Sequence, residues 1–290
     1  SAAHIGKATT VKSEPNTRAD AVEAHAYPEL VSERRGNALY LRLNNPKALN
    51  CLSPAMINSL MAAIDIVQHA PDIRAVIFTG TGRAFCAGAD LKAVEALGRE
   101  QGVSEDVALD GFLQRVGELF SRIEALPVPT IAMLNGITMA GGLELALCCD
   151  LIYAESDVRI GDGHATYAML PGGGGTVRLP KRIGLARTKF IMFSGDLYSA
   201  EECRDWGLVD LVAGPGRLND LVENFTAKLG AKSRLGLTRM KKLVNAAWDL
   251  PAREGLQAEL AECREHALSH DRNEGLAAFT EKREPRFRGY

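Results

Sequence analysis

Residues 130–154, TIAMLNGITMAGGLELALCCDLIYA, decide the fold, and the rest of the chain repeats their pattern. The run from Thr130 to Leu134 predicts a short buried strand, because its residues are almost all apolar. Asn135-Gly136 predicts a turn, Gly141-Gly142 opens a short helix, and Asp150 to Ala154 predicts a second strand. A strand, a helix and a strand in succession favour mainly parallel pairing.

The segments on the N-terminal side alternate in the same way. Ser53 followed by Pro54 is typical of a helix start, with serine at the N-cap and proline at the first helical position. The predicted elements are two strands at 30–34 and 38–43, a helix at 53–69, a strand at 74–79, a helix from about Leu91 and a longer helix at 107–126.

The C-terminal side predicts helices at 185–194 and 200–206, a strand at 208–212 and an almost wholly helical remainder. The expected fold class is α/β. We divide the chain into a flexible N-terminal tail, a core domain and a helical C-terminal region, at residues 1–27, 28–216 and 217–290. The last region has no predicted sheet of its own, which favours a role in oligomerisation.

The composition is that of a globular protein and disfavours several functions. The 290 residues carry 34 Lys and Arg against 36 Asp and Glu, a formal net charge of −2. Nucleic-acid binding needs a basic excess or a basic stripe, so we expect no nucleic-acid partner. Six cysteines form no CxxC pair, which favours reduced thiols and a cytoplasmic location. The least polar long stretch contains Asn135 and Glu144, so we expect no membrane span.

Motifs for several well-defined activities are absent from the sequence. It contains no GxxxxGK[ST] loop, no GxSxG nucleophile elbow and no HExxH zinc site. The glycine run from Gly172 to Gly175 fails the dinucleotide fingerprint, because Val177 occupies the position of its third glycine. Asp162 and His164 alone are too few ligands for a metal site. We therefore expect neither a metal nor a redox cofactor.

Two glycine-bearing junctions between a strand and a helix are the strongest candidates for chemistry. They are FCAGADL, residues 85–91, and NGITMAGGLE, residues 135–144. The first N–H groups of a helix have no internal partner and are free to bind a ligand oxygen. Two such amides at one carbonyl oxygen form an oxyanion hole, in which each donor supplies about 3–4 kcal/mol of transition-state stabilisation. The alternative is that these glycines serve only close backbone packing.

Five blocks of sequence form an ordered series over about residues 30 to 288. They are NNPKALN, GTGRAFCAGADLK, NGITMAGGLELALCCDLIYA, MLPGGGGTVRLPKRIG and AAFTEKREPRFRG. Together they resemble the successive signatures of the enoyl-CoA hydratase/isomerase family, also called the crotonase family. The resemblance implies the ClpP/crotonase fold, a repeated ββα spiral with a helical C-terminal region. It also implies chemistry on acyl-CoA thioesters, whereas the reaction itself varies within such a family.

The resemblance assigns catalytic roles to three residues. It implies that the amides of Ala87 and Gly141 form the oxyanion hole for the thioester carbonyl. It also implies that Glu144 is one of the two catalytic carboxylates of a hydratase. Asp150 matches a structural aspartate that anchors a turn.

The resemblance also implies how coenzyme A and further subunits are bound. Ala87, Gly88, Ala89 and Asp90 lie where the family's loop wraps the coenzyme A moiety of the substrate. Phe279 and Lys282 lie where a C-terminal helix, often from a neighbouring subunit, approaches the adenine and phosphate end. The expected assembly is a homotrimer or a dimer of trimers. Coenzyme A enters as part of the substrate, so no further cofactor is expected.

The sequence departs from the family at the second acid/base position. Hydratases of the family carry a glutamate seven residues before the proline of PGxGG, and this chain has His164 seven residues before Pro171. A histidine that faces substrate is suited to proton transfer near pH 7, and the alternative is a loop histidine without catalytic duty. Asp162 either orients the imidazole or, in an extended loop, points away from it. Tyr167 is a further candidate pocket group, and packing is the alternative.

The preferred function is hydration of the 2,3-double bond of an enoyl-CoA thioester. In that interpretation Glu144 activates water, and His164 supplies or removes the α-proton. A double-bond isomerase, which manages with one carboxylate, and a C–C bond hydrolase, which suits a histidine base, are alternatives within the family. An RNA-binding relative is the non-enzymatic alternative, which the intact Glu144 and the near-neutral net charge disfavour.

Overall fold

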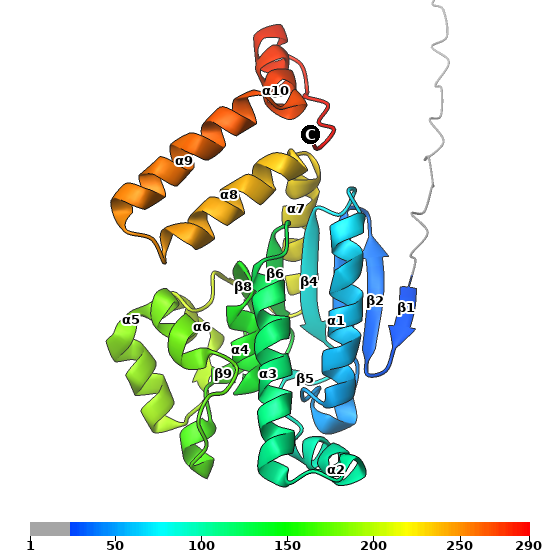
Figure 1. Ribbon diagram of the computed structural model, residues 1–290, viewed down its shortest axis with the longest axis vertical. Helices are drawn as coiled ribbons and strands as arrows, with labels where there is room; N and C mark the ends of the chain where they lie inside the picture. Colours follow the sequence, from blue (N-terminus) through cyan, green and yellow to red (C-terminus); the bar gives the residue numbers. More distant parts are fainter. Residues whose placement is uncertain (1–23) are drawn as a thin grey trace, which may run out of the picture.

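Two sheets form the centre of the computed structural model, which describes residues 24–290 (Figure 1). The seven-stranded sheet has the order β1-β2-β3-β4-β6-β8-β11, with β1 (Ala24–Tyr27), β2 (Leu30–Arg35), β3 (Ala38–Leu43), β4 (Ala75–Gly80), β6 (Thr130–Leu134), β8 (Leu151–Glu155) and β11 (Leu211–Ala213). The four-stranded sheet has the order β10-β9-β7-β5, with β10 (Tyr198–Ser199), β9 (Arg159–Gly161), β7 (Ile137–Met139) and β5 (Ala84–Cys86).

Helices surround these sheets, and four of them follow one another after the last strand, β11. The helices are α1 (Pro54–His69), α2 (Leu91–Gln101), α3 (Glu105–Glu124), α4 (Gly141–Leu147), α5 (Gly175–Ser194), α6 (Ala200–Asp205), α7 (Leu218–Gly230), α8 (Arg234–Ala247), α9 (Ala252–Ala267) and α10 (His270–Glu281). Two short 3₁₀ turns, η1 (Pro46–Ala48) and η2 (His164–Tyr167), interrupt the loops. In the described part of the chain, no helix combines the length and apolar character needed to cross a membrane.

Strand pairing confirms the expected α/β class with mainly parallel strands. The pairs β3–β4, β4–β6, β6–β8 and β8–β11 are parallel, and helices connect their strands. The pairs β1–β2 and β2–β3 are antiparallel. Residues 24–27, expected to belong to a flexible tail, instead form β1, because they pair with Leu30 to Glu33 of β2. The remainder of that predicted tail, residues 1–23, lies outside the described residues.

Alternating side chains of the central strands build a core on each face of the large sheet. Leu39 and Leu41 of β3 pack on the face covered by α1 and α3, whereas Tyr40 packs on the opposite face. Burial of both faces explains why β4, AVIFTG, is a continuous run without the polar alternation of a half-exposed strand. The helix α1 begins as predicted, with Ser53 Oγ accepting a hydrogen bond from Met56 N at 3.0 Å.

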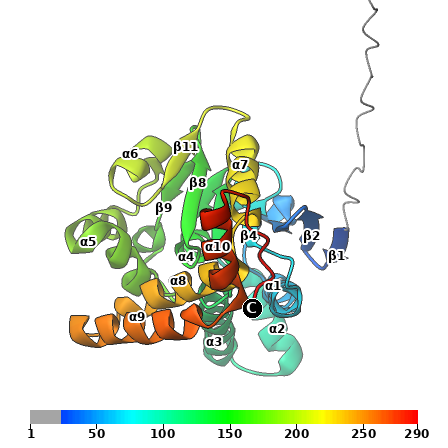
Figure 2. The same cartoon turned by 90° about the horizontal axis from the view of Figure 1, so that it is seen from above.

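The helix α7 belongs to the core, which corrects the expected boundary at residue 216. Its side chains Leu218, Val222 and Leu229 pack with Tyr40 and with other strand residues on the second face of the large sheet. The figures agree, since α7 lies along the strands in both views (Figure 2). The predicted boundary fell too early, because the short strand β11 looks like the last core element.

Helices α8 and α9 differ from α7, because neither contains a buried residue. They lie side by side and project from the upper end of the molecule in Figure 1. Lys241 of α8 holds this pair to the core: its Nζ lies 2.8 Å from Asp150 Oδ2 and donates to Val128 O at 3.1 Å. Asp150 also accepts a hydrogen bond from Thr130 N at 2.8 Å, which agrees with its expected anchoring role.

Candidate active site

The two glycine junctions predicted from the sequence lie against each other. The first follows β5 and contains Gly88 at φ +122°, and the second opens α4 at Gly141. A Cβ atom added to Gly141 would lie 3.3 Å from the carbonyl carbon of Gly88 and 3.5 Å from Ala89 N. Only a small residue therefore allows the backbones to approach so closely.

In the first junction the amides of Gly88 and Ala89 have no acceptor within residues 24–290, and Ala89 N is the one that lies against Gly141, so the expectation that Ala87 is an oxyanion donor is wrong. Ala87 N donates to Leu49 O at 3.1 Å, so it is not free to bind a ligand oxygen. Asp90 N likewise donates to Leu52 O at 2.9 Å. Among the residues that the structure describes, the amides of Ala89 and Gly141 have no acceptor. These two neighbouring N–H groups are the pair that an oxyanion hole requires.

The start of α4 is backbone-strained at the residue before Gly141. Ala140 has φ 52° and ψ −119°, in the positive-φ half of the map that residues with a Cβ atom avoid. Such a conformation costs on the order of 1–3 kcal/mol and collects at functional sites. Ala140 N donates to Gly161 O at 3.2 Å, which ties this strained turn to the end of β9. This strained turn directly precedes Gly141.

Glu144 lies one turn into α4 and is held by a glycine loop. Its side chain is buried, with 4% of the residue exposed, and Oε1 accepts hydrogen bonds from Gly173 N at 2.9 Å and Gly175 N at 2.8 Å. A Cβ atom at Gly173 would lie 2.7 Å from Glu144 Oε2 and 2.8 Å from Phe120 Cε2. The run GGGG at 172–175, for which sequence reasoning found no role, therefore holds the carboxylate of Glu144.

The environment of Glu144 makes its carboxylate more basic than an exposed one. Burial raises the pKa of Glu144, because a carboxylate loses hydration there. The amide of Gly175, the positive charge of His164 and the amide of Gly173 oppose this rise. Asp162 adds to it by repulsion between like charges. The result is a carboxyl group poised to accept a proton.

His164 and Asp162 lie together, since the loop between them is bent. Gly163, at φ +73°, turns the chain so that His164 Nδ1 lies 3.1 Å from Asp162 Oδ1. The Nδ1 atom is buried, and its N–H direction is not aligned with the carboxylate, so the contact is an ion pair without a directed hydrogen bond. Contact with Asp162, followed by the charge of Glu144, raises the pKa of His164, although burial opposes this. The positively charged imidazolium is therefore favoured.

Arg178 and Arg182 of α5 support the backbone around Glu144. Arg178 Nη1 donates to Gly173 O at 3.1 Å, and Arg178 Nη2 lies 3.1 Å from Glu124 Oε2. Arg182 Nη2 donates to Cys149 O and Asp150 O, just after the end of α4. These guanidinium groups have internal partners and stabilise the loop and helix that carry Glu144.

Other predicted residues lie away from this centre. Asp90 caps α2, because its Oδ1 accepts from Ala93 N at 3.0 Å. Phe279, 83% exposed, and Lys282 lie on and just after α10, at the opposite end of the molecule from α2 (Figure 1). One chain therefore does not bring them to the junction that contains Asp90. Tyr167 is 71% exposed, so it does not pack within this chain.

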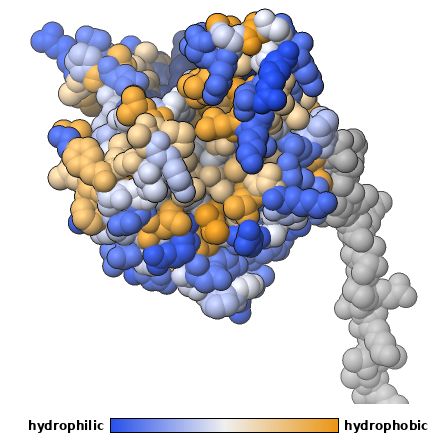
Figure 3. Space-filling model, turned by 90° about the horizontal axis from the view of Figure 1, so that it is seen from below, coloured by the Kyte–Doolittle hydropathy of each residue, from blue (hydrophilic) through white to orange (hydrophobic). Residues whose placement is uncertain are grey.

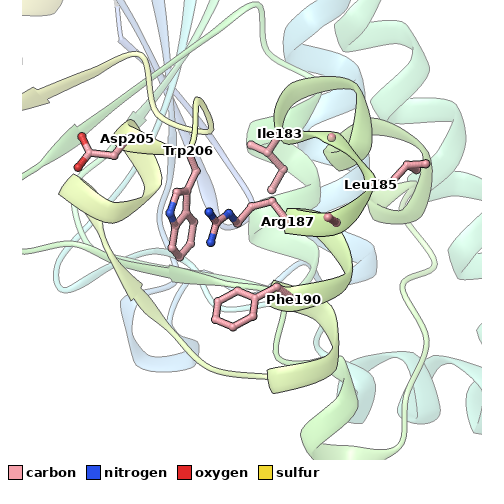
Figure 4. Close-up of a pocket in the computed structure, with 8 residues that line it drawn as sticks. Ile183, Leu185, Arg187, Phe190, Asp205 and Trp206 are labelled. Carbon is pink, nitrogen blue, oxygen red and sulfur yellow. The ribbon is translucent and has the colours of Figure 1, made fainter.

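Two surface hollows lie outside the cradle of Glu144. One, of about 590 Å³, lies beside α5 and α6, where the guanidinium carbon of Arg187 is 4.5 Å from the ring centre of Trp206 (Figure 4). The other, of about 540 Å³, lies between α1, α2 and α3 and is lined mainly by apolar residues such as Val94, Leu97 and Phe112. Figure 3 views the molecule from this lower end and shows apolar surface amid charged residues.

The described residues bring together no three His, Cys, Asp or Glu side chains that would hold a metal ion. The centre consists instead of two free amides, one buried carboxylate and an Asp–His ion pair. Such a centre has the groups that an enzyme needs to stabilise an oxyanion and to move protons with side chains.

Comparison with known proteins agrees with this class. The family model described as enoyl-CoA hydratase/isomerase matches residues 33–290. Enoyl-CoA isomerase/hydratase fer4 of Mycosarcoma maydis is 33% identical over 92% of this chain and 97% of its own length. Mitochondrial enoyl-CoA hydratase of Pongo abelii is 32% identical over 89% of this chain and 87% of its own length. The chain belongs to the enoyl-CoA hydratase/isomerase family.

Solved structures confirm the crotonase fold that the resemblance implied. The crystal structure of an enoyl-CoA hydratase from Bacillus anthracis superposes with a TM-score of 0.84, at 32% identity, over 90% of this chain and all of that one. An enoyl-CoA hydratase from Mycobacterium tuberculosis gives a TM-score of 0.79 at 32% identity, over 91% of this chain and 100% of that one.

Proposed function

We propose that the protein adds water across the 2,3-double bond of an enoyl-CoA thioester. The observation that carries this proposal is the buried carboxylate of Glu144, which two loop amides hold in place. Glu144 lies on α4 one turn after Gly141, whose amide is free. A fixed base beside an oxyanion hole is the arrangement that addition to a conjugated thioester requires.

The thioester oxygen is the first group that the site acts on. The N–H groups of Ala89 and Gly141 donate to this oxygen and stabilise the negative charge that develops on it as the enolate forms. The amides belong to rigid backbone, so they need no reorganisation during the reaction. Ala140, strained at φ 52°, fixes the direction of the Gly141 donor.

Two side chains supply and remove the protons. Glu144, as a carboxylate, takes a proton from water while the water oxygen bonds to the β-carbon and the electron pair of the double bond moves toward the thioester. The imidazolium of His164 then gives its proton to the α-carbon. The raised pKa values of both groups suit these roles, since Glu144 becomes a stronger base and His164 stays protonated. A proton passing from Glu144 to His164 restores the starting state.

The coenzyme A moiety of the substrate extends from this centre along Gly88, Ala89 and Asp90 in our proposal. Phe279 and Lys282 would reach the adenine and phosphate end from a second copy of the chain, since in one chain they lie at the opposite end from α2. No cofactor besides the substrate's own coenzyme A enters the proposed reaction. Acetyl-CoA should raise the melting temperature by mass action, and NAD should raise it much less.

Self-association in a trimer or a dimer of trimers is part of this proposal. Helix α8 exposes Met240, Val244 and Trp248 at four-residue spacing, and α9 exposes Leu256 and Leu260 in the same way. Such stripes normally pack against another apolar surface. Sedimentation velocity on the parent and on a Val244→Glu variant tests this. We expect a trimer or larger species in the parent and smaller species in the variant.

The cytoplasmic location stays a prediction. All six cysteines are free, which suits a reducing compartment. Named relatives include a mitochondrial enoyl-CoA hydratase.

Mass spectrometry of the product after incubation with crotonyl-CoA and longer 2-enoyl-CoA thioesters tests the proposed reaction. A product heavier by one water supports hydration.

The Asp162–His164 pair favours C–C bond hydrolysis as the second candidate, because a histidine paired with a carboxylate also suits activation of water for attack on a ketone. A 3-oxoacyl-CoA thioester cleaved by water to a shorter carboxylic acid and acetyl-CoA would indicate that reaction, and a rearranged product of unchanged mass would indicate an isomerase. Filter binding at physiological salt tests the RNA-binding alternative.

A further inference from the structure

Asp162 is a buried carboxylate that the proposed reaction does not use. It follows β9 directly, is 2% exposed, and faces His164 with both oxygens. Oδ1 lies 3.1 Å from His164 Nδ1, and Oδ2 accepts a weak hydrogen bond from His164 N at 3.3 Å. A buried carboxylate is costly unless it is paired, so its place beside this imidazole requires an explanation.

We infer that Asp162 is a positioning residue that keeps His164 in its proton-donating form and leaves Nε2 as the nitrogen that delivers the proton. This inference rests on the proposed function. The ring has two nitrogens on different sides, and the one facing Asp162 cannot also face the substrate. Because Asp162 contacts Nδ1, Nε2 is the nitrogen left to donate a proton to the substrate.

The charges around His164 explain why an anion is needed there. Helix α4 presents Glu144, and α5 presents Arg178, whose charge interacts with Glu144 and which is itself paired with Glu124. Strand β7 presents the apolar side chain of Met139, which lies against Gly163.

With only Glu144 and His164 present, a buried pair could neutralise itself by moving the proton from the imidazolium to the carboxylate. In that neutral pair Glu144, the base, is protonated and His164, the acid, is deprotonated. Hydration needs the reverse. Asp162 disfavours the reversed state. Its negative charge also raises the pKa of Glu144, but Asp162 is in direct contact with the imidazolium, 3.1 Å from Nδ1, so its stronger effect is to keep His164 protonated.

An Asp162→Asn variant tests this role, with Asp157→Asn as the matched control. Asparagine keeps the size of the side chain and removes its charge. Asp157 lies in the same segment, before β9, and is exposed. NMR titration of ¹³C-labelled histidine follows His164 directly, and its signal is assigned by its loss in His164→Gln. We expect Asp162→Asn to lower the pKa of His164 by about one unit or more and Asp157→Asn to leave it unchanged.

Kinetics of hydration provide the second measurement. An acid in the free enzyme gives kcat/KM a limb that falls as the pH rises through its pKa. We expect Asp162→Asn to move this limb to lower pH by the same amount and to regain much of the parent rate in acid. An unmoved His164 titration, or a rate lowered equally at every pH, would overturn the inference and leave Asp162 a structural residue.

Folding and the proposed function are controlled separately. Should Asp162→Asn fail to fold, Asp162→Ser, which is smaller and also uncharged, undergoes the same titration. The NMR experiment needs no substrate, so it tests the role of Asp162 even where product analysis finds no hydration. Absence of hydration in the parent protein contradicts the proposed function, whereas an unmoved titration contradicts the positioning role.

Discussion

Glu144 and His164 lie in one site but are held there by different physical means. Glu144 stands on a regular helix, and two backbone amides of a glycine loop fix one of its oxygens. His164 stands on a short 3₁₀ turn and is held by the charge of Asp162. The amide donors that hold Glu144 do not titrate, so Glu144 alone sets the pH dependence there, whereas both partners of the Asp162–His164 pair carry charges that change with pH. The two halves of the site should therefore respond differently to substitution and to pH.

Replacing the base should have the largest effect. Glu144→Gln keeps the shape and still accepts from Gly173 and Gly175, but it cannot take a proton from water. We expect kcat to fall about 1000-fold at every pH, within the range of general acid–base contributions. Steady-state hydration kinetics measure this fall. A loss under tenfold would mean that another group is the base.

Removing one oxyanion donor should have the next largest effect. Gly141→Pro deletes one of the two free N–H groups, and we expect at least about a 100-fold fall in kcat for any thioester substrate. Ala87→Gly serves as the control, since the amide of Ala87 is bonded to Leu49 and its side chain is not a donor. The circular dichroism spectrum should match the parent. Parent-like activity in a folded Gly141→Pro protein would contradict the assignment.

Removing the imidazole should give a loss that depends on pH. His164→Ala deletes the acid, so we expect kcat/KM to fall by about 100-fold where the parent histidine is protonated and by less at high pH. The falling limb of the pH profile should vanish with it, because the raised pKa of His164 sets that limb. His164→Glu restores the carboxylate typical of the family's hydratases and should recover crotonyl-CoA hydration. An unchanged rate and profile in His164→Ala would leave a one-carboxylate catalyst, and an isomerase would then be preferred.

Filling the hollow between α1, α2 and α3 should change only substrate preference. Gly111 of α3 lines this hollow, and a Cβ atom there meets nothing within 4 Å. We expect Gly111→Leu to lower kcat/KM for long-chain enoyl-CoA thioesters about tenfold and to spare crotonyl-CoA, if the hollow receives the acyl chain. Gly111→Ala controls for the gain in helix propensity. Equal effects on long and short substrates would exclude the hollow as the acyl site.

The smallest effect should be a change in stability. Glu144→Gln, the variant expected to lose the most activity, should be slightly more stable than the parent. The folded-state pKa of Glu144 lies above its unfolded value, so the folded protein is stabilised by protonation and loses that contribution as the pH rises through the folded pKa. Glu144→Gln removes the buried charge, and its melting temperature should exceed that of the parent by about 2 °C at neutral or higher pH. The gain should vanish below about pH 4, near the ordinary pKa of the carboxyl group. Calorimetry at both pH values checks this.

Prediction from the sequence succeeded where local chemistry decides the structure. Strands β3 and β6 were predicted to the residue, because each is a nearly continuous apolar run, and α1 followed from Ser53 and Pro54. Strands β5, β7 and β9 were not predicted, since three residues show no periodicity and their pairing comes from distant segments. The first half of α5 was missed because Pro180 lies inside it and Gly184 breaks it at φ 77°.

The site shows the same division. The resemblance predicted roles for Gly141, Glu144 and His164, because their positions follow from fixed spacing. Spacing could not tell which amide of the first junction is free, so Ala87 was chosen in place of Ala89. The glycine run at 172–175 was visible, but its role depends on a helix almost thirty residues earlier in the chain.

The position of the exposed apolar helices along the chain affects how the protein is made. Ribosomes release the chain from its N-terminus, and domains tend to fold in that order during synthesis. The sheets, α4 and the loop that cradles Glu144 are complete before α8 and α9 emerge. A nascent chain therefore forms its core before it carries the stripes of Met240, Val244 and Leu256. The self-association that we propose therefore begins only after the core-forming part of the chain has been made.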